Sequence, residues 1–461
     1  MLYSAYELGV TVFSPARIAA GFGARAWRSP MNPLAQTWLG RSSAAALDLF
    51  ENATRRYPKP EWGIDSTTIN GVRVPVTIEE THRKDFCSLI HFKRDAAALK
   101  KAKAAGDQKD KGTDPCVMIV APLSGHYATL LRGTVEAMIK EHDVYITDWV
   151  DARTVPVTAG RFDLNDYIDY LIEFIRVLNP LSDGAGVNTM AVCQPGPALM
   201  AAAAIMAEDK DPARPASMTI MGSPIDTRRS PTVPNVLSKE RPYEWFAQNM
   251  IQTVPAPYPG VFRRVYPGFI QLYSFLSMNS DRHLNAQYDY FQHLVEGDGD
   301  SADKHRTFYD EYLAVLDMTE ECYLQTIRDV FQEHSLAKGT FMHRGRLVDP
   351  SAITDIALMT VEGEKDDISG IGQTQAAHDL CTNIPENMEI DYIQPNVGHY
   401  GVFNGSRWRS EIQPRIRDFI RTKKSKPATK SKSVAAKKAA PKKAIKNSAK
   451  KPTGKTAKKR A

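Results

Sequence analysis

One cysteine stands at a sharp turn between an expected strand and an expected helix. The strand is predicted over residues 187–192, Cys193 follows it, and a helix of mostly alanines is predicted over residues 198–207. A thiol at a helix N-terminus lies near partial positive charge, which favours the thiolate. The next residue, Gln194, keeps a backbone N–H that can stabilise an oxyanion. This arrangement predicts a nucleophile for acyl transfer; the alternative is a buried cysteine at the end of a strand.

Two further residues stand where the partners of such a nucleophile belong. In α/β-hydrolases the order along the chain is nucleophile, acid and base. Asp366 follows a late apolar strand, with Asp367 as the reserve, and His399 follows the last expected strand. We predict that His399 deprotonates Cys193 and then protonates the leaving alcohol, while Asp366 orients the imidazole. Solvated loop carboxylates and a surface histidine are the alternatives.

The loop after the first strand of this region supplies a further part of the predicted site. In this fold such a loop provides the second oxyanion N–H, and we assign that role to the backbone of Ser124 or Gly125. His126 is a candidate for substrate contact, and shaping the loop is its alternative role. The usual Gly-x-Ser-x-Gly box is not kept, because Ala191 and Pro195 occupy the two glycine positions.

Strands and helices alternate along most of the chain. Strands are predicted over residues 116–122, 143–148, 187–192, 218–222, 356–362 and 388–393, and helices over residues 127–140, 164–178, 198–207, 373–381 and 412–422. Short apolar runs are typical of strands buried in a parallel sheet, and the alternation indicates helices on both faces. A β-branched pattern over residues 64–94 predicts a hairpin or meander. The expected fold class is the α/β-hydrolase fold with a mostly parallel central sheet.

Composition divides the chain into four predicted parts. These are an N-terminal helical segment (1–60), a core (61–225 and 346–421), a helical, aromatic-rich cap insertion (226–345) and a disordered Lys/Ala/Pro-rich tail (422–461). Within the cap, Trp245 and Phe246 are candidates for contact with an apolar substrate, and packing inside the cap is the alternative. The aromatic spacing over residues 262–273 predicts a helix that is broken at Pro267.

Charge is distributed unevenly between these parts. The 461 residues carry a net charge of +6, but the last 41 residues hold 17 Lys or Arg and no acidic residue. The first 420 residues therefore carry 42 basic and 53 acidic side chains, a net charge of −11. A uniformly basic nucleic-acid-binding domain is excluded, and the tail is expected to be an interaction arm. It has no aromatic residue to stack on bases, so we expect salt-sensitive, sequence-independent binding to DNA, polyphosphate or an anionic granule coat.

Cysteine usage and hydropathy point to a protein of the cytoplasm. The five cysteines are odd in number and form no Cys-x-x-Cys pair, which argues against a disulfide framework or a zinc site. Apolar runs long enough for a transmembrane helix, about 18 residues, are absent from the sequence. The N-terminus does not have the basic start and unbroken apolar run of a secretory signal. No metal is expected.

Five motifs of this chain resemble those of the intracellular poly(3-hydroxybutyrate) depolymerases. They lie at residues 122–132, 145–149, 192–196, 362–367 and 398–401. The resemblance implies an α/β-hydrolase that degrades native, amorphous polyhydroxybutyrate in cytoplasmic granules with a cysteine nucleophile. It implies that Cys193 is the nucleophile, Asp366 the acid and His399 the base. The Lys-rich tail is a departure from the family pattern.

The same resemblance leaves the fate of the acyl-enzyme open. Polyhydroxyalkanoate synthases are similar to this family and also use a cysteine, but they pass the acyl group to a growing chain. Hydrolysis needs no cofactor, whereas thiolysis would use coenzyme A as the acyl acceptor. A protein with weak catalysis that tethers granules to the nucleoid through its tail is the alternative from another functional class.

Overall fold

The computed structural model describes residues 2–106, 113–278, 280–296 and 298–422. The chain divides into two compact units, Met1–Ser425 and Lys426–Ala461. The described residues belong to the first unit, and the predicted disordered tail lies outside them except for Thr422. In the described part of the chain no helix is long and apolar enough to cross a membrane.

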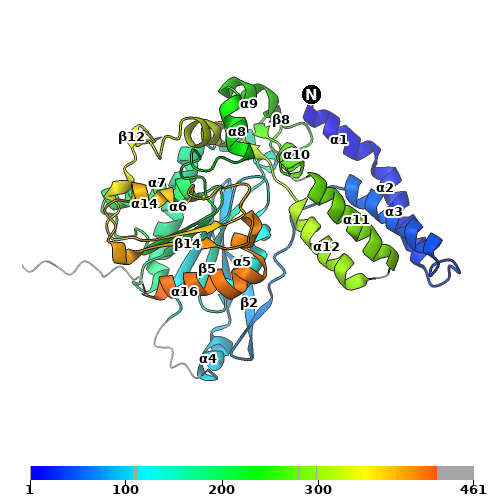
Figure 1. The fold of residues 1–461 in the computed structure, drawn as a ribbon, viewed down its shortest axis with the longest axis horizontal. Helices are drawn as coiled ribbons and strands as arrows, with labels where there is room; N and C mark the ends of the chain where they lie inside the picture. The colour runs from blue at the N-terminus through cyan, green and yellow to red at the C-terminus, as the bar shows by residue number, and fades with distance from the viewer. Residues whose placement is uncertain (1, 107–112, 279, 297, 423–461) are drawn as a thin grey trace, which may run out of the picture. The chain divides into compact units, whose positions relative to one another are not determined.

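A nine-stranded sheet lies at the centre of the first unit (Figure 1). Its strand order is β1 (Ser66–Ile69), β2 (Val72–Arg83), β3 (Cys87–Arg94), β5 (Asp143–Trp149), β4 (Cys116–Val120), β6 (Asn188–Val192), β7 (Ser217–Met221), β13 (Ala357–Gly363) and β14 (Glu389–Gln394). The pairs β1–β2, β2–β3 and β3–β5 are antiparallel, and every later neighbour pair is parallel. This is the α/β-hydrolase fold, so the predicted fold class is confirmed.

The burial of the strands follows from their sequences. All residues of β4, β6, β7 and β13 are buried. A strand that is buried on both faces must be covered by helices on both sides, which explains why these strands read as continuous apolar runs. By contrast, β2 at the antiparallel end alternates between buried and exposed residues near its start. The 64–94 meander is therefore confirmed as β1 to β3.

Each helix predicted beside the strands of the sheet is present. These helices are α5 (Arg132–Met138), α6 (Leu164–Leu178), α7 (Gly196–Glu208), α14 (Ala376–Leu380) and α16 (Gln413–Thr422), of which α5 and α14 are shorter than predicted. The same region also contains α4 (Ala96–Ala104) and α15 (Gly405–Arg407). The α6 helix matches its prediction residue for residue, because Asp163 accepts hydrogen bonds from the N–H groups of Asn165 and Asp166 and so sets its start. The alanine-rich α7 packs against α6.

The segment predicted as a helical insertion also contains strands. Its helices are α8 (Val233–Glu240), α9 (Tyr243–Asn249), α10 (Gly268–Met278), α11 (Ser280–Glu296), α12 (Gly299–Tyr312) and α13 (Glu320–Thr326). A small antiparallel sheet joins β8 (Gln252–Thr253), β9 (Arg264–Tyr266) and β10 (Met318–Thr319), and a hairpin joins β11 (Met342–His343) and β12 (Arg346–Leu347). The insertion is therefore not purely helical.

The aromatic stripe over residues 262–273 does not lie on one broken helix, so that prediction is wrong. Phe262 lies in a loop with a positive φ of 71°, Tyr266 ends β9, and α10 begins at Gly268. A Cβ atom on Gly268 would lie 2.8 Å from the Leu316 carbonyl oxygen. The close approach of these two backbones, together with the missing N–H of Pro267, explains the change from strand to helix.

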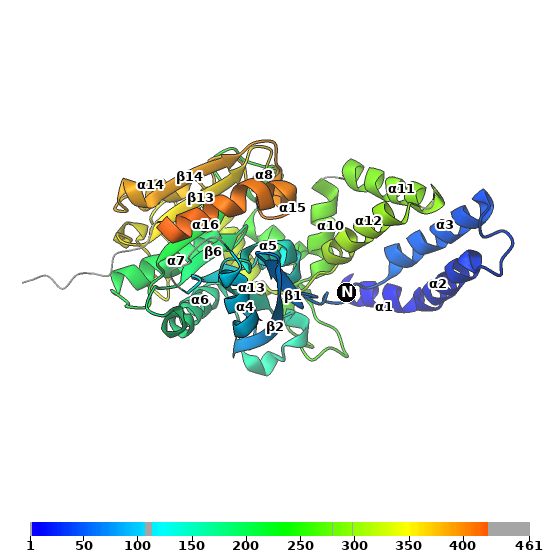
Figure 2. The same cartoon turned by 90° about the horizontal axis from the view of Figure 1, so that it is seen from below.

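Three helices form the N-terminal segment, which the sequence predicts to be helical. They are α1 (Leu2–Val12), α2 (Ser14–Arg28) and α3 (Trp38–Thr54). The α2 and α3 helices pack against each other, and α3 also packs against α11 of the insertion (Figure 2). The N-terminal segment thus lies against the insertion.

A buried polar cluster joins α1 to the insertion and to the loop after β5. The Tyr3 hydroxyl donates to Oδ2 of Asp317 at 2.5 Å, and the Gly268 N–H donates to Oδ1 at 2.8 Å. The Asp317 N–H donates to Asp151, which forms an ion pair with Arg153 at 2.7 Å. Burial and the nearby Asp151 raise the pKa of the Asp317 carboxyl to about 7, although Arg153 and the two hydrogen bonds oppose the rise.

The titration of Asp317 predicts how stability depends on pH. Because its pKa is raised on folding, the folded protein keeps a proton that the unfolded chain has released. The free energy of unfolding should therefore fall as the pH rises from about 4 to about 7. Asp317→Asn should flatten this part of the profile, which urea unfolding at pH 5 and pH 7 would measure. A variant with an unchanged pH profile would contradict the assignment.

Candidate active site

The turn that carries Cys193 is held in a strained backbone conformation. Cys193 has a positive φ of 68° between β6 and α7, a region that residues other than glycine rarely adopt. Its N–H donates to the Met221 carbonyl at 2.8 Å, and its carbonyl accepts a hydrogen bond from the Ser223 hydroxyl at 2.6 Å. Met221 at the end of β7 and Ser223 just after it therefore hold both the N–H and the carbonyl group of Cys193 in place.

The glycine required at the elbow lies one residue later than the motif places it. A Cβ atom on Gly196 would lie 2.5 Å from Ser223 Cβ and 2.9 Å from Ile220 Cγ2. Pro195 precedes this glycine just before the helix, where a missing N–H costs no hydrogen bond. The close packing of helix and strand that the second motif glycine normally allows is thus supplied by Gly196, which the sequence analysis did not identify.

Replacing Gly196 with alanine should disturb the elbow. Over-packing of this kind typically costs about 1–3 kcal/mol, so we expect a lower free energy of unfolding in urea and a lower turnover number. Gly9→Ala is the matched control, because a Cβ atom at this position in α1 would meet no atom within 4 Å. This control should be neutral or slightly stabilising. Equal stability of the two variants would show that the contact at Gly196 relaxes freely.

His399 and Asp366 meet beside this turn. His399 begins a short 3-10 helix after β14, and its Nδ1 lies 2.8 Å from Oδ2 of Asp366. Both side chains are buried. The other carboxylate oxygen of Asp366 accepts hydrogen bonds from the N–H groups of Ile368 and Ser369. The reserve candidate Asp367 is exposed, so the structure brings Asp366 to the imidazole.

Electrostatics links the three predicted residues. Burial opposes the charged imidazolium, but Cys193 and Asp366 both interact with His399 and raise the pKa of its imidazole well above the ordinary value. A Cβ atom on Gly222 at the end of β7 would lie 3.3 Å from His399 Cε1 and 3.4 Å from Asp366 Oδ2. The pair is therefore packed directly against the sheet edge. Cys193, His399 and Asp366 thus interact with one another, as the sequence analysis expects, and their catalytic roles stay predictions.

The other four cysteines differ from Cys193 in burial. Cys193 is half-buried, whereas Cys87, Cys116, Cys322 and Cys381 are fully buried, and all five are free thiols. Burial raises the pKa of Cys116 and of Cys381 to about 12. Buried thiols that hold their protons are poor nucleophiles.

A buried glutamate that the sequence analysis did not single out fixes the loop carrying Asp366. Glu362 lies near the end of β13 and accepts hydrogen bonds from three backbone N–H groups, those of Gly372, Thr374 and Gln375. Its carboxylate thereby ties the far end of the loop to the strand from which the loop departs. This contact positions Asp366 through the backbone.

The predicted oxyanion elements lie together, with an unexpected contact. The Gln194 side-chain oxygen accepts a hydrogen bond from the Leu123 N–H at 3.1 Å, so the elbow is tied to the loop after β4. Gly125 has a positive φ of 111°, and its carbonyl accepts a hydrogen bond from the Leu316 N–H. The amide that points toward Gln194 is thus that of Leu123. The roles of the Gln194, Ser124 and Gly125 amides stay predictions.

His126 fastens the insertion to this loop. It is buried, and its Nε2 donates to the Tyr312 carbonyl at 3.1 Å. Its ring lies 5.4 Å from that of Phe275 and 5.1 Å from that of Tyr312, and burial lowers its pKa to about 4. A neutral, buried histidine of this kind fits the shaping role that the sequence left open. Direct contact with substrate stays a prediction.

The two aromatic candidates of α9 lie side by side. The Trp245 and Phe246 rings are 5.1 Å apart, and Arg241 lies over the Trp245 ring. Phe246 is only 3% exposed and belongs to the main hydrophobic core, so it takes the packing alternative. Trp245 packs on the same core and is half-buried; substrate contact by this residue stays a prediction.

Two tyrosines that the sequence analysis did not identify lie next to the catalytic candidates. Tyr400 follows His399, with ring centroids 6.0 Å apart, and Tyr312 at the end of α12 lies 5.9 Å from Tyr400. Burial raises the pKa of Tyr400 well above its ordinary value, and Tyr312 and Cys193 add to the rise. The insertion therefore contributes an aromatic side chain that packs against Tyr400.

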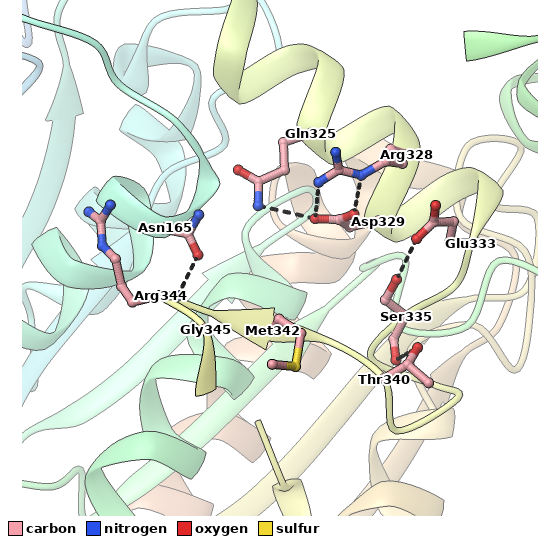
Figure 3. Close-up of a pocket in the computed structure, with 10 residues that line it drawn as sticks. All are labelled: Asn165, Gln325, Arg328, Asp329, Glu333, Ser335, Thr340, Met342, Arg344 and Gly345. Carbon is pink, nitrogen blue, oxygen red and sulfur yellow. Dashed lines mark hydrogen bonds and ion pairs between the residues drawn. The ribbon is translucent and has the colours of Figure 1, made fainter. Parts of the chain in front are cut away.

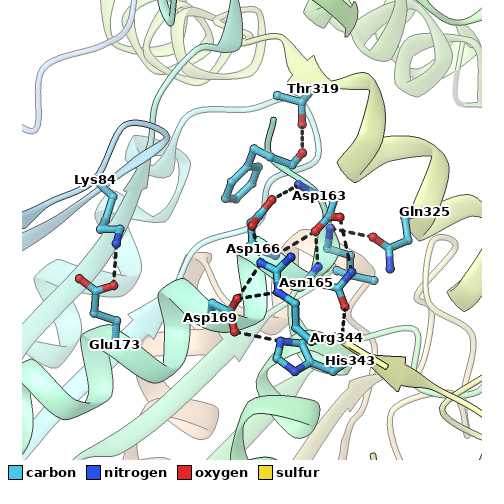
Figure 4. Close-up of polar contacts among 12 residues, drawn as sticks. Lys84, Asp163, Asn165, Asp166, Asp169, Glu173, Thr319, Gln325, His343 and Arg344 are labelled. Atoms are coloured by element: carbon cyan, nitrogen blue, oxygen red, sulfur yellow. Dashed lines mark hydrogen bonds and ion pairs between the residues drawn. The ribbon is translucent and has the colours of Figure 1, made fainter. Parts of the chain in front are cut away.

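Two cavities lie away from these residues. Their volumes are about 590 and 580 Å³, and neither is lined by Cys193, His399 or Asp366 (Figure 3). Arg344 lines both cavities, but its guanidinium is ion-paired with Asp166 and Asp169 (Figure 4). These opposite charges neutralise one another, so the Arg344 guanidinium is already paired. The described residues also contain no group of three or more His, Cys, Asp or Glu side chains that could hold a metal ion.

One stretch of the chain matches a known protein family. Residues 222–424 match the family model "PHB de-polymerase C-terminus". That stretch contains Asp366 and His399 but begins after Cys193. The matched range therefore includes Asp366 and His399 and excludes Cys193.

Two curated proteins are distant relatives. A poly(3-hydroxyalkanoate) polymerase subunit PhaC from Synechocystis sp. is 22% identical over 286 residues, which are 60% of this chain and 68% of the relative. The PhaC subunit from Haloferax mediterranei is 21% identical over 66% of this chain and 58% of its own length. Among solved structures, a soluble variant of monoglyceride lipase from Saccharomyces cerevisiae aligns with a TM-score of 0.44 and 10% identity over 80% of this chain and all of that one. The chain thus combines an α/β-hydrolase fold with a region similar to the C-terminal part of polyhydroxybutyrate depolymerases.

Proposed function

We propose that this protein is an intracellular polyhydroxybutyrate depolymerase that hydrolyses the ester bonds of native, amorphous granules to 3-hydroxybutyrate monomers or oligomers. The observation that carries the proposal is the contact of Cys193, His399 and Asp366 beside a strained turn at the end of β6. The match of residues 222–424 to the depolymerase C-terminal model supports the choice of polyester.

The chemistry starts with the thiol. His399 takes the proton of Cys193, and the thiolate attacks the ester carbonyl to give a tetrahedral oxyanion that backbone N–H groups stabilise. Collapse of this intermediate breaks the C–O bond, and the imidazolium of His399 returns the proton to the leaving alkoxide. The product is a thioester on Cys193 and a shortened chain that ends in a hydroxyl group.

Water then hydrolyses the thioester on Cys193. His399 takes a proton from the water as its oxygen attacks the carbonyl, and the second intermediate expels the Cys193 thiolate, which recovers that proton. Asp366 accepts a hydrogen bond from Nδ1–H of His399 throughout, so the imidazole presents Nε2 to the thiol and its positive charge is stabilised. The 3-hydroxyacyl group leaves as a carboxylate.

Acyl transfer is the second candidate function. The two curated relatives are named polymerase subunits, and the same acyl-enzyme can pass its acyl group to a polymer hydroxyl or to the thiol of coenzyme A. A granule-to-nucleoid tether with weak catalysis is a third reading, which would rest on the basic tail outside the described residues.

One experiment separates these outcomes. Purified full-length protein is incubated with amorphous poly(3-hydroxybutyrate) granules in ¹⁸O-labelled water, with and without coenzyme A, and the products are analysed by mass spectrometry. Hydrolysis predicts 3-hydroxybutyrate species with ¹⁸O in the new carboxylate, independent of coenzyme A. Unlabelled coenzyme A thioesters would instead establish thiolysis. Absence of any product or acyl-enzyme would favour the tether.

A further inference from the structure

The N-terminal helices pack with small residues inside. Buried residues of α2 are Ala20, Gly21 and Ala24, and buried apolar residues of α3 include Ala44 and Ala45. A Cβ atom on Gly21 would lie 3.1 Å from a Glu51 carboxylate oxygen, and one on Gly23 would lie 3.0 Å from Leu47 Cδ1. The two helices therefore approach each other closely and bury little large apolar surface between them.

The large apolar side chains of these helices point outward instead. Of the 26 large apolar side chains exposed on the described residues, eleven lie within the first 50 residues: Leu2, Leu8, Val12, Phe13, Ile18, Phe22, Met31, Leu34, Trp38, Leu39 and Phe50. Leu8 and Val12 are four residues apart on α1, as are Ile18 and Phe22 on α2, so each pair shares a helix face. A helix that faces water normally shows the opposite pattern.

The same surface continues onto the neighbouring insertion. The α3 helix packs against α11 (Figure 2), where Leu284 and Tyr288 are 68% and 63% exposed. Helix α12 packs against α11 and ends at Tyr312, whose ring lies 5.9 Å from that of Tyr400. A partner bound to the N-terminal helices would thus lie against the structural elements that reach the catalytic candidates.

The charged residues of the N-terminal helices indicate which kind of partner this surface binds. Residues 2–54 contain four arginines and three acidic residues, Glu7, Asp48 and Glu51. Glu7 is ion-paired with Arg56 and Asp48 with Arg28, whereas the exposed Arg25 lies over the Phe22 ring. Exposed apolar side chains flanked by arginines are the pattern of helices that lie at the boundary of an apolar phase. The tail of this chain is too poor in apolar residues to be the partner that covers these side chains, because residues 423–461 contain only Val434 and Ile445 as large apolar residues.

We propose that α1 to α3 and the adjoining exposed side chains of α11 are the surface by which the protein docks on amorphous polyester. This inference rests on the proposed function, in which the substrate is an uncharged, water-insoluble polymer. Helices with exposed Ile18, Phe22 and Trp38 insert these side chains into the polymer surface, while the exposed Arg25 stays in water. The docked protein then holds Cys193 close to chain segments that do not diffuse to it.

The test compares two double variants of the full chain. The docking variant is Ile18→Ser with Phe22→Ser, at positions 56% and 66% exposed. The control variant is Leu181→Ser with Val233→Ser, at positions 52% and 61% exposed that lie after α6 and at the start of α8. Each is tested for co-sedimentation with protein-free, lipid-free amorphous poly(3-hydroxybutyrate) particles and for hydrolysis of those particles and of a water-soluble butyrate ester.

The expected result is a selective loss. The docking variant should lose at least tenfold in particle binding and particle hydrolysis, keep soluble-ester hydrolysis within twofold, and keep its thermal unfolding midpoint. The control variant should behave like the wild type. Particle binding by the docking variant equal to that of the wild type would overturn the proposal. Binding of the wild type to anionic phospholipid vesicles but not to polyester would also overturn it. So would light scattering that shows a dimeric wild type and a monomeric docking variant.

The binding measurement separates this inference from the proposed function. If the wild type hydrolyses neither substrate but binds the particles, and the docking variant does not bind, the docking surface stands and the depolymerase assignment fails. If the wild type and the docking variant hydrolyse the soluble ester and bind the particles equally, the hydrolase assignment stands and the docking surface fails.

Discussion

Cys193→Ala is expected to abolish release of 3-hydroxybutyrate from amorphous granules, with a loss in turnover on the order of 10⁴-fold or more. The reason is that no other thiol can take over. Cys193 is the half-buried cysteine at the strained turn beside His399, and the other four are fully buried. The loss should appear equally with granules and with a soluble ester, because both depend on the same acyl-enzyme.

The acyl-enzyme itself can be trapped. Incubation with an activated butyrate ester, followed by acid quenching and peptide mass spectrometry, should find the added acyl mass on the peptide that contains Cys193. Cys381→Ala is a matched control, since it removes a fully buried thiol whose pKa is about 12; it should retain turnover even where it lowers stability. Turnover that survives in Cys193→Ala, or an adduct on another cysteine, would remove Cys193 from the mechanism.

Asp366→Asn should produce the second large effect, a fall of about 10⁴-fold in turnover with little change in fold. Asp366 accepts the hydrogen bond from Nδ1 of His399 and contributes to the raised pKa of the imidazole. An amide at this position no longer fixes the tautomer or supports the imidazolium. The pKa of His399 should therefore fall in the variant, which NMR titration of the imidazole Cε1–H would show.

The neighbouring carboxylate provides the control for this experiment. Asp367→Asn changes the same charge one residue further along the loop, at an exposed position. Its turnover should stay within about twofold of the wild type, since exposed charges act weakly on buried groups. If the two variants lost turnover to the same extent, the assignment of the acid to Asp366 alone would be wrong.

Local sequence patterns were sufficient to predict the elements that carry the site. Short apolar runs identified β4, β6, β7 and β13, because strands buried on both faces need apolar residues throughout, and the alternation of apolar and polar residues identified β14. The order of Cys193, Asp366 and His399 after three of these strands then placed them at one sheet edge. A parallel sheet brings the carboxyl ends of its strands together, so the structure could bring Asp366 and His399 into contact as expected.

Contacts between distant segments were not predictable in this way. The need for glycine at position 196 comes from Ser223 and Ile220, which lie on another strand and the loop after it. The hydrogen bond between Gln194 and Leu123 joins residues 71 positions apart. The approach of Tyr312 to Tyr400 depends on how the insertion packs. No spacing rule within one segment contains this information, so the glycine shift, the tied loop and the aromatic neighbours of the site were missed.

The hydrogen bond between Tyr3 and Asp317 has a consequence for synthesis of the chain. Its partners are 314 residues apart, and ribosomes add roughly 5–20 residues per second. Helix α1 therefore waits about 15–60 s for the aspartate to be made, and during that time Tyr3 and Tyr6 lack the Phe269 ring against which they pack. Nascent chains should consequently present these helices to holding chaperones before the hydrolase core exists. Fusion of a tag directly before Tyr3 would disturb this contact.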